Sequence, residues 1–470
     1  MGNVKVGLRP IVSNINLPTV LRTAILPGDT VERLFIATQV GEIFYIEDDG
    51  VRTFLDIRSR VIELGTENGG YDERGLVGLA FHPQFYYNGL FYLHYAVAGT
   101  QGPGAPYQDF VPDPCDPSTL NLRWENREAQ FDHIDTVEEW GLTYSGQPQK
   151  KRTLLNLRRP FFNHNGVNSL NFSPETGKLV LTTGDGGSGY DPFHLSQDNM
   201  EIAGKIIEID VNQFPLIDNP LVVTRFNELP FSIQEALTVT AKGVRNMPGI
   251  AYQRCNQQYI KYVGNVGQEM VEAVFAFDNY LRIPVTYITQ NPWMNSKLNL
   301  AGFINFGWRG WEGDIPTVIL EKCTNSPTSK KTIAYFDEAV ALTDNRLRPL
   351  TSYYHEDPRP DKFEGNALTG VQVYMGNDIP WLTGGVIFTD FFRTDSGPQS
   401  KGALAYTFLR RDGKQNAFQE INVDYNFGSE SAYYASLGTN LNQTRLYLGV
   451  YGSMNVTDFN QGSVYEIVPY

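Results

Sequence analysis

Four stretches of the chain share one pattern, and this repetition restricts the possible folds more than any other feature. Each has a short apolar run, a turn of roughly five to eight residues and a second apolar run, followed by Gly or Ala. Near-continuous apolar runs of this kind predict antiparallel hairpins that are buried on both faces. The four stretches are GLAFHPQFYYNGLFYLHYA, SLNFSPETGKLVLTTGD, GIAYQRCNQQYIKYVGNVG and ASLGTNLNQTRLYLGVYG.

A shorter element accompanies these hairpins. It begins with Gly and carries alternating large apolar residues, which predicts an outer strand with one face covered. Four-stranded units repeated around a ring make a β-propeller, and a pair of large β-sandwiches is the alternative. We expect the last copy of the element to pair with N-terminal strands and so close the ring. The copies are GEIFYIE, GKIIEID, GALAYTF and GSVYEIV.

No segment is rich enough in Gly, Ser or Pro to act as an interdomain linker, so we expect one domain over residues 1–470. A polar insertion at about 98–150 interrupts the repeats. Long insertions of this kind usually lie on one rim of a fold and shape a site there.

The net charge of −14 argues against nucleic acid and anionic membranes as partners, because both require basic surfaces. The longest apolar stretches are too short to span a bilayer, and the first residues contain no apolar core of signal-peptide length.

Cys115, Cys255 and Cys323 are too few for a disulfide scaffold and have no CxxC spacing, so we expect no zinc site. Three free thiols, or one pair and one free thiol, both remain open.

His164 stands in the run NHNG, just before a strand–turn–strand pattern that ends on Asp185 in GDGG. A hairpin of this length can bring the two side chains to neighbouring strand ends. The pair then has the chemistry of a general base with its orienting carboxylate. An ordinary polar loop, with His164 capping a turn and Asp185 starting one, is the alternative.

The stretch ERGLVGLAFHPQFYYNGLFYLHYA resembles the glucose/sorbosone dehydrogenase family, whose soluble quinoproteins use pyrroloquinoline quinone (PQQ). Further similar stretches follow in the family's order, among them FNHNGVNSLNFSPETGKLVLTTGDGG, GVRNMPGIAY and ALTGVQVYMGNDIPWLTGGVIFTDFF. The resemblance implies an all-β fold, a six-bladed β-propeller of four-stranded antiparallel blades. The same fold occurs in the propeller of hedgehog-interacting protein, a binder and not an enzyme, so it leaves the activity open.

The resemblance also implies roles for individual residues. His164 matches the base that removes a proton from a sugar hydroxyl, Asp185 matches its orienter, and Arg245 matches the cation beside the quinone carbonyl. Asn246 follows it in the same cofactor-binding stretch. Pro248 departs from the pattern, because the family has a glutamine there.

In YVGNVGQEMVEAV the resemblance implies a calcium and cofactor loop, in which Gly267 and Gln268 would hold Ca²⁺ and Gln268 would also touch PQQ. Glu272 matches the family's glutamate, but Val271 replaces a neighbouring acid. Trp308, in NFGW, is expected in the core.

PQQ is a tricarboxylate and needs cations around it. The late stretch of the sequence supplies Arg393 and Lys401 as candidates, but the expected arginine pair is missing and Glu430 stands near its place. In the stretch GKIIEID, Glu208 replaces a basic residue that is common in the family.

Two hypotheses follow. The first is a PQQ- and Ca²⁺-dependent dehydrogenase that moves a hydride from the hydroxyl carbon of a sugar or polyol to the quinone, which the retained His164, Asp185 and Arg245 favour. The second is a cofactor-free propeller that acts as a binding or structural module, such as a component of a surface layer or particle, with self-assembly or a protein partner. The missing late arginines and Val271 favour it. So does the lack of a visible export signal, since enzymes of this family usually work outside the cytoplasm.

Overall fold

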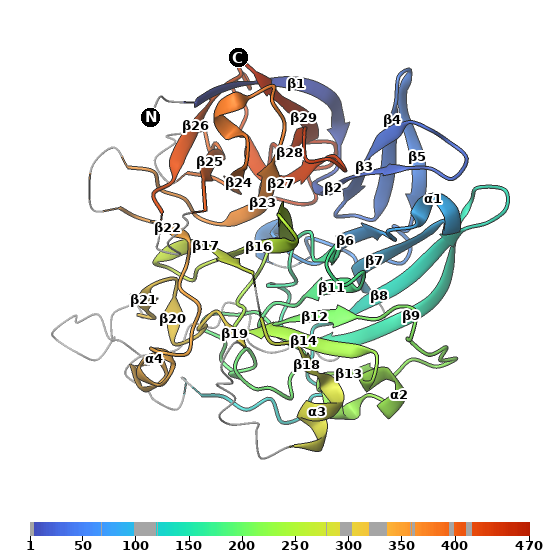
Figure 1. Cartoon of the computed structure of the whole chain (residues 1–470), viewed down its shortest axis with the longest axis vertical. Coiled ribbons are helices and arrows are strands. Elements are labelled where there is room, and N and C mark those ends of the chain that lie inside the picture. Colours follow the sequence, from blue (N-terminus) through green and yellow to red (C-terminus); the bar gives the residue numbers. More distant parts are fainter. Residues whose placement is uncertain are drawn as a thin grey trace.

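The chain forms a ring of antiparallel β-sheets whose innermost strands surround a central axis (Figure 1). Each end of the space around this axis, which we call the channel, holds a cavity lined by the inner strands. The computed structural model describes residues 4–66, 68–97, 119, 121–278, 280–291, 303–318, 336–357, 359, 362–393, 399–409 and 416–470. The strands group into six blades of four, so the predicted six-bladed β-propeller is confirmed and the pair of β-sandwiches is wrong.

The strands of each blade are given from the channel outward. The first blade holds β2 (Pro18–Ile25), β3 (Glu32–Thr38), β4 (Glu42–Glu47) and β5 (Gly50–Asp56). The second holds β6 (Leu76–Phe81), β7 (Leu90–Val97), β8 (His133–Leu142) and β9 (Pro148–Arg159). The third holds β10 (Leu170–Phe172), β11 (Leu179–Thr182), β12 (Lys205–Ile209) and β14 (Leu237–Lys242).

The other three blades follow around the ring. The fourth holds β15 (Ile250–Cys255), β16 (Gln258–Asn265), β17 (Val271–Phe277) and β22 (Thr351–Tyr354). The fifth holds β23 (Leu368–Tyr374), β24 (Gly385–Asp390), β25 (Ala403–Thr407) and β26 (Gln419–Asp424). The sixth holds β27 (Tyr433–Thr439), β28 (Leu446–Tyr451), β29 (Gly462–Pro469) and β1 (Val4–Ile15).

The four predicted hairpins are the first two strands of the second, third, fourth and sixth blades. The shorter Gly-led elements are third strands, namely β4, β12, β25 and β29. The expectation of an outer strand with one covered face is wrong for β12 and β25, which are buried along their whole length. A fourth strand lies outside each of them, and neighbouring parts of the fold cover both faces.

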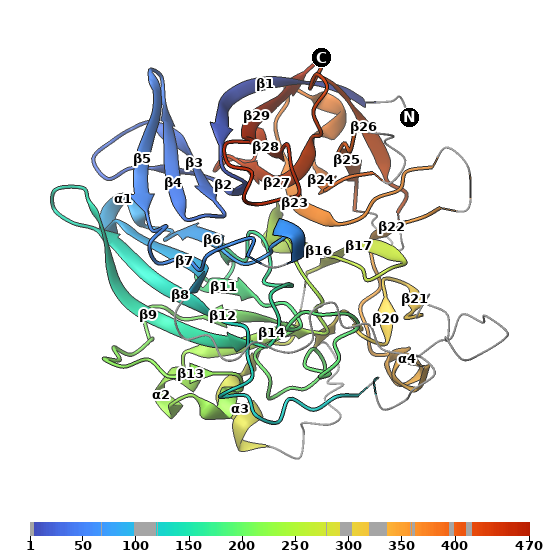
Figure 2. The ribbon, with the colours of Figure 1, turned by 180° about the vertical axis from the view of Figure 1, so that it is seen from behind.

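The ring closes through the N-terminal strand. β1 pairs antiparallel with β29 and, on its other edge, parallel with β26. Figures 1 and 2 show β1 running along the outside of these two strands, with both chain ends nearby. The predicted pairing of the stretch GSVYEIV with N-terminal residues is therefore confirmed, and β1 links the fifth and sixth blades.

Adjacent blades are held together by apolar side chains packed between their faces. Between the first and second blades, the ring of Phe54 lies 5.1 Å from that of Phe35 and 5.1 Å from that of Phe91. All three side chains belong to one buried cluster. Aromatic contacts of this size contribute a large share of the core's stability.

The remaining elements are short. The described strands outside the blades are β13 (Val222–Val223), β18 (Ile283–Pro284), β19 (Ile304–Asn305), β20 (Trp311–Glu312) and β21 (Ile315–Pro316). The α-helices are α1 (Phe85–Asn88), α2 (Phe231–Gln234), α3 (Val285–Gln290) and α4 (Phe336–Leu342), and the 3₁₀ turns are η1 (Asn68–Gly70), η3 (Phe226–Glu228) and η5 (Pro380–Leu382). No helix within the described ranges is long and apolar enough to cross a membrane.

The expected insertion at about 98–150 is shorter than its predicted bounds, because β8 and the start of β9 occupy residues 133–150. These two strands belong to the second blade. Residues 98–118 lie outside the described part of the chain, as do Cys115 and Cys323. Cys255 is a free thiol at the end of β15.

The six inner strands run from one mouth of the channel to the other. Residues at their first ends line one cavity, and residues at their last ends line a second cavity. In β2, for example, Thr19 lines the first cavity and Arg22 lines the second. Each mouth is therefore built by six segments that lie far apart in the sequence.

Candidate functional site

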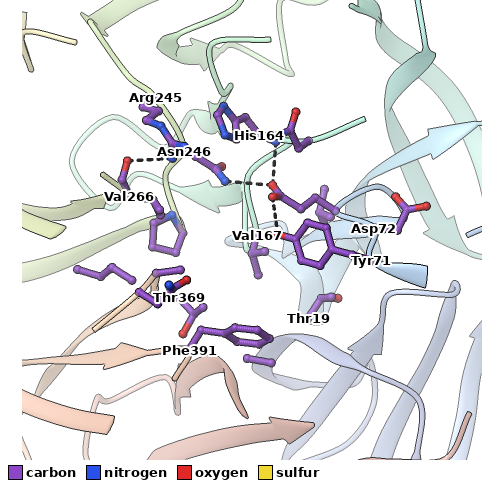
Figure 3. A pocket seen from close by; sticks show the side chains of 18 of the residues that line it. Thr19, Tyr71, Asp72, His164, Val167, Arg245, Asn246, Val266, Thr369 and Phe391 are labelled. Atoms are coloured by element: carbon purple, nitrogen blue, oxygen red, sulfur yellow. Dashed lines mark hydrogen bonds between the residues drawn. The ribbon is translucent and has the colours of Figure 1, made fainter. Parts of the chain in front are cut away.

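The cavity at the first mouth of the channel has a volume of about 610 Å³. This is within the range of pockets that hold small molecules. We call it the dyad pocket, and its polar lining includes Thr19, Gln39, Tyr71, Asp72, Glu73, Asn163, His164, Arg245, Asn246, Gln268, Asn366 and Thr369. Figure 3 shows the labelled side chains among them converging from several blades on one space.

His164 and Asp185 meet as the sequence predicts. The Nδ1 atom of His164 lies 2.7 Å from Oδ1 of Asp185, across 21 residues of chain. Because a carboxylate accepts, Nδ1 carries the hydrogen and Nε2 is left as an acceptor. No residue in the described ranges donates a hydrogen bond to Nε2, while His164 lines the cavity. An ordinary polar turn would account for the backbone here, but not for the hydrogen bond between the two side chains or for the position of His164 at the cavity.

Two features hold this dyad in place. The indole Nε1 of Trp308 donates to the second oxygen of Asp185 at 2.8 Å, and the N–H of Gly187 donates to the first at 3.0 Å. His164 itself has a φ of 60°, and its carbonyl oxygen accepts from Arg159 at 2.8 Å. Gly184 lies so close that a Cβ there would meet that carbonyl oxygen at 1.8 Å, so only glycine fits.

Glu73 is the residue that sequence reasoning missed. Its Oε2 accepts from the backbone N–H of His164 at 2.8 Å and from the amide of Asn246 at 3.4 Å. The Tyr71 hydroxyl donates to its other oxygen at 2.6 Å. Figure 3 shows these three hydrogen bonds meeting on one carboxylate inside the pocket. The only signal in the sequence was an acid three residues before the start of the inner strand β6.

Arg245 also lies at the pocket wall. Its Nε donates to Oε1 of Gln268 at 3.1 Å, and its Nη1 donates to the carbonyl of Val266 at 3.3 Å. The guanidinium carbon lies 5.7 Å from the ring centre of Trp308. Within the described residues Arg245 has no carboxylate partner, so its charge is available to a ligand.

Gly267 and Gln268 line the same wall. Oε1 of Gln268 accepts from Arg245 and also from the N–H of Tyr190 at 3.0 Å. The N–H of Gly267 donates to Glu272 at 3.0 Å. This loop is therefore held by internal hydrogen bonds, and a Ca²⁺ role for Gly267 and Gln268 stays a prediction.

The late-blade candidates lie elsewhere. Arg393 pairs with Glu420 at 2.6 Å, Lys401 is exposed, and neither belongs to the lining of the dyad pocket. Glu430 is exposed and outside that lining as well. Glu208 is buried in the third blade, where it accepts from Tyr280 at 3.0 Å. The structure thus brings His164, Asp185, Arg245, Asn246, Gly267 and Gln268 together, and it does not bring Arg393 or Lys401 to them.

Behind the pocket wall lies a buried group of ionisable side chains. Glu272 accepts from His355 Nε2 at 2.7 Å and from the N–H of Leu368 at 2.9 Å. Asp390 accepts from the Tyr353 hydroxyl at 2.6 Å. Burial, reinforced by the negative charge of Glu272, raises the pKa of Asp390 to about 8. Although burial opposes it, the hydrogen bond to Glu272 raises the pKa of His355.

We expect stability to fall as the pH rises from about 5 to 8, and Asp390→Asn to weaken this dependence. In that range folded Asp390 keeps a proton that the unfolded chain, with a carboxyl pKa of about 3.9, has lost, so its contribution declines until the pH passes about 8. His355 acts in the same direction above a pH of about 6.5. Melting temperatures from pH 5 to 8 measure the slope.

The matched control is Asp49→Asn, which removes an exposed carboxylate of the first blade. It should leave the slope of the wild type unchanged. Equal slopes for Asp390→Asn and the wild type would contradict the raised pKa of Asp390.

A tricarboxylate quinone does not fit the described lining. Arg245 is the one arginine or lysine that the described lining contains. The lining also contains two acids, Asp72 and Glu73. Asp72 is neutralised by Arg74 at 2.7 Å, whereas every donor to Glu73 among the described residues is uncharged. Three cofactor carboxylates would therefore meet one guanidinium and one unpaired carboxylate in a partly desolvated pocket, which is costly.

For calcium, the described residues contain no group of three or more His, Cys, Asp or Glu side chains that could hold a metal ion. Glu312, near the same loop, accepts from the backbone N–H groups of Glu269 at 3.0 Å and Val271 at 2.9 Å. Its second oxygen is buried without a partner, and burial raises its pKa. Peptide donors therefore hold one oxygen of this carboxylate in place.

Comparison with known proteins identifies a family and several relatives that this chain resembles. A family model described as Glucose / Sorbosone dehydrogenase matches residues 20–287. The HIPL1 protein of Arabidopsis thaliana is 24% identical over 386 residues, which cover 77% of this chain and 50% of the relative. Hedgehog-interacting protein of Homo sapiens is 26% identical over 249 residues, 52% of this chain and 31% of the relative. The chain thus spans about half or less of the length of these relatives.

Solved structures agree on the fold. The PQQ-bound aldose sugar dehydrogenase of Streptomyces coelicolor superposes with a TM-score of 0.55 at 14% identity, over 99% of this chain and 98% of that one. The apo form of the soluble aldose sugar dehydrogenase of Escherichia coli gives a TM-score of 0.56 at 13% identity, over 99% and 100%. Since the family model covers more than half of the sequence, this chain belongs to the Glucose / Sorbosone dehydrogenase family.

Proposed function

We propose that this protein is a binding propeller whose dyad pocket takes an uncharged sugar or polyol without PQQ. The observation that carries this proposal is the Glu73 carboxylate, which shares the pocket with Arg245 and is held beside His164 by uncharged donors. The pocket then presents acceptors at Glu73 and at Nε2 of His164, and a donor at Arg245. Such a mixture suits hydroxyl groups, which both donate and accept hydrogen bonds.

A PQQ- and Ca²⁺-dependent sugar dehydrogenase is the second candidate. It is favoured by the dyad itself, because an imidazole held by Asp185, with Nε2 facing a pocket, is the arrangement of a general base. Family membership and the likeness to sugar dehydrogenases support the same substrate class. Both candidates therefore predict that sugars bind at His164, and they differ in the cofactor.

Titration of the protein with glucose, and separately with PQQ and Ca²⁺, distinguishes the binding propeller from the dehydrogenase. We expect glucose or a related polyol to release heat and raise the melting temperature, and His164→Ala to weaken that binding about tenfold, since it loses one buried acceptor. We expect PQQ with Ca²⁺ to give no absorbance change, no thermal shift and no dye reduction with glucose. Dye reduction that His164→Ala abolishes would establish the dehydrogenase and overturn our proposal.

Glu73→Gln tests the reason for excluding the quinone. It removes the negative charge and keeps one acceptor oxygen, so we expect PQQ affinity to rise relative to the wild type. The matched control is Glu63→Gln, which removes an exposed charge outside the lining. It should leave the affinity for PQQ unchanged. If Glu73→Gln binds PQQ no better than Glu63→Gln does, the charge argument is wrong.

A further inference from the structure

The second mouth of the channel holds a separate cavity of about 640 Å³. It is lined by the last residues of the inner strands and the turns that follow them. Its basic lining residues are Arg22, Arg254 and His82, and the described lining contains no Asp or Glu. In a chain with a net charge of −14, such a wall is unusual. We call this cavity the arginine pocket.

Arg22 projects from β2 and is half-buried. Its Nη2 donates to Oδ1 of Asn168 at 2.9 Å and to the carbonyl of Leu170 at 2.7 Å, so neutral groups hold it in place. Its Nε is buried without a partner, and no described carboxylate pairs with it. Burial lowers the pKa of Arg22 to about 10, which leaves it protonated at neutral pH. A partly desolvated guanidinium without a counter-charge favours an incoming anion.

Arg254 and His82 extend this surface. Arg254 is exposed near the end of β15, and its Nε has only a long contact of 3.4 Å with the carbonyl of Asn256. The N–H of Gln84 donates to Nδ1 of His82 at 3.0 Å, so Nε2 carries the hydrogen. Burial lowers the pKa of His82, which keeps the ring neutral and leaves it a hydrogen-bond donor at neutral pH.

The rest of the wall suits hydroxyl groups and the apolar face of a sugar ring. The amide nitrogens of Gln372 and Gln443 donate to backbone carbonyls at 3.2 Å and 2.7 Å, which leaves their side-chain oxygens as acceptors. Phe172 and Tyr252 supply aromatic faces. The volume lies within the range of small-molecule pockets, so a bare inorganic anion would leave most of it unfilled.

Two carboxylates close to the lining, Glu32 and Glu175, have other partners. Glu32 accepts from the Thr23 hydroxyl at 2.5 Å and from the N–H of Leu441 at 2.7 Å. Glu175 pairs with Lys261 at 2.7 Å and Arg282 at 2.8 Å. Neither acid belongs to the lining, and within the described residues neither forms an ion pair with Arg22 or Arg254.

We propose that the arginine pocket binds a sugar that carries one carboxylate or phosphate group, with the anionic group on Arg22 and Arg254 and the hydroxyls on the glutamine oxygens. This ligand differs from the uncharged one proposed for the dyad pocket. The two sites lie at opposite mouths of the channel. An experiment that disproves one proposal therefore does not disprove the other.

Calorimetric titration with four probes tests the site: glucuronate, glucose 6-phosphate, glucose and inorganic phosphate. We expect one or both charged sugars to bind at least tenfold more tightly than glucose and than phosphate alone, with an affinity that falls as salt rises. Comparing glucuronate with glucose 6-phosphate shows which anionic group is preferred. Because glucose is also expected in the dyad pocket, the anion role would be overturned if glucose bound as tightly as the charged sugars and Arg22→Gln weakened both equally. Equal affinity for inorganic phosphate would overturn the sugar role.

Substitutions in the two pockets test whether the charged sugar binds in the arginine pocket. Arg254→Gln should weaken the charged sugar several-fold and Arg22→Gln at least tenfold, while Arg52→Gln, an exposed arginine of the first blade, should have no effect. If Arg22→Gln does not fold, Arg22→Lys keeps the charge but loses the planar fork, and it should weaken binding less than tenfold. Asn246→Ala in the dyad pocket should leave this affinity unchanged. Unchanged affinity in Arg254→Gln and either folded Arg22 variant would overturn the assignment.

Discussion

Deleting residues 4–15 is expected to abolish the cooperative unfolding transition of the whole ring. These residues form β1, which closes the sixth blade against β29 and pairs with β26 of the fifth. Val4, Val6, Leu8 and Ile15 are buried, and burying four aliphatic side chains contributes roughly 6 to 12 kcal/mol. That is comparable to the whole stability of a typical domain. Calorimetry or circular dichroism melting of the deletion variant measures the loss.

A synthetic peptide with the sequence of residues 4–15 provides the matched test. Added to the deletion variant, it should restore the transition in a concentration-dependent way, because the exposed edge of β29 accepts a strand. A peptide in which Val6 and Leu8 are replaced by Asp should not restore it. A deletion variant that melts within a few degrees of the wild type would show that the ring closes without β1.

Asp185→Ala is expected to destabilise the protein by roughly 3 kcal/mol or more and to weaken sugar binding at least tenfold. The carboxylate accepts from His164, Trp308 and Gly187, and each buried donor left without an acceptor costs about 1–3 kcal/mol. Without Asp185 the imidazole also loses the group that orients it. Urea denaturation and calorimetric titration with glucose measure the two effects.

Asp185→Asn separates stability from orientation. An asparagine of the same size still accepts from Trp308, so we expect most of the stability to return. Its amide nitrogen, however, donates to Nδ1 of His164, which moves the imidazole hydrogen to Nε2 and removes the acceptor that faces the pocket. Nitrogen-15 NMR of the ring reports this change of tautomer. If Asp185→Asn binds sugar as well as the wild type, the tautomer has no role in binding.

Much of the fold followed from local pattern. The hairpin around Leu170 and Leu181 was recognisable because both runs are apolar and a turn lies between them, and the structure pairs these two residues directly. The position of β12 was recognisable, but its burial was not, because its side chains pack in two clusters built from distant parts of the chain, Ile207 and Ile209 in one and Ile206 in the other. The number of blades came from the family resemblance and not from the repeat itself, which is irregular in length.

The site was recoverable only in part. His164 and Asp185 are 21 residues apart on either side of one hairpin, so short-range geometry was enough to join them. Glu73 lies 91 residues from His164 and 173 from Asn246, and nothing in its surroundings in the sequence marks it as a pocket residue. Arg393 was expected there from its place in the chain, and it instead pairs with Glu420.

The sequence by itself determined the hairpin strands, their pairing and the closeness of His164 and Asp185 along the chain. Each of these depends on apolar alternation, turn residues or contacts close along the chain. Only the tertiary structure decided the charge of the two channel mouths, with Glu73 opposite Arg245 at one and the unpaired Arg22 at the other. The physical reason is that each mouth is assembled from the ends of six strands spread over the whole chain, so its electrostatics arise from neighbours in space that no local pattern specifies.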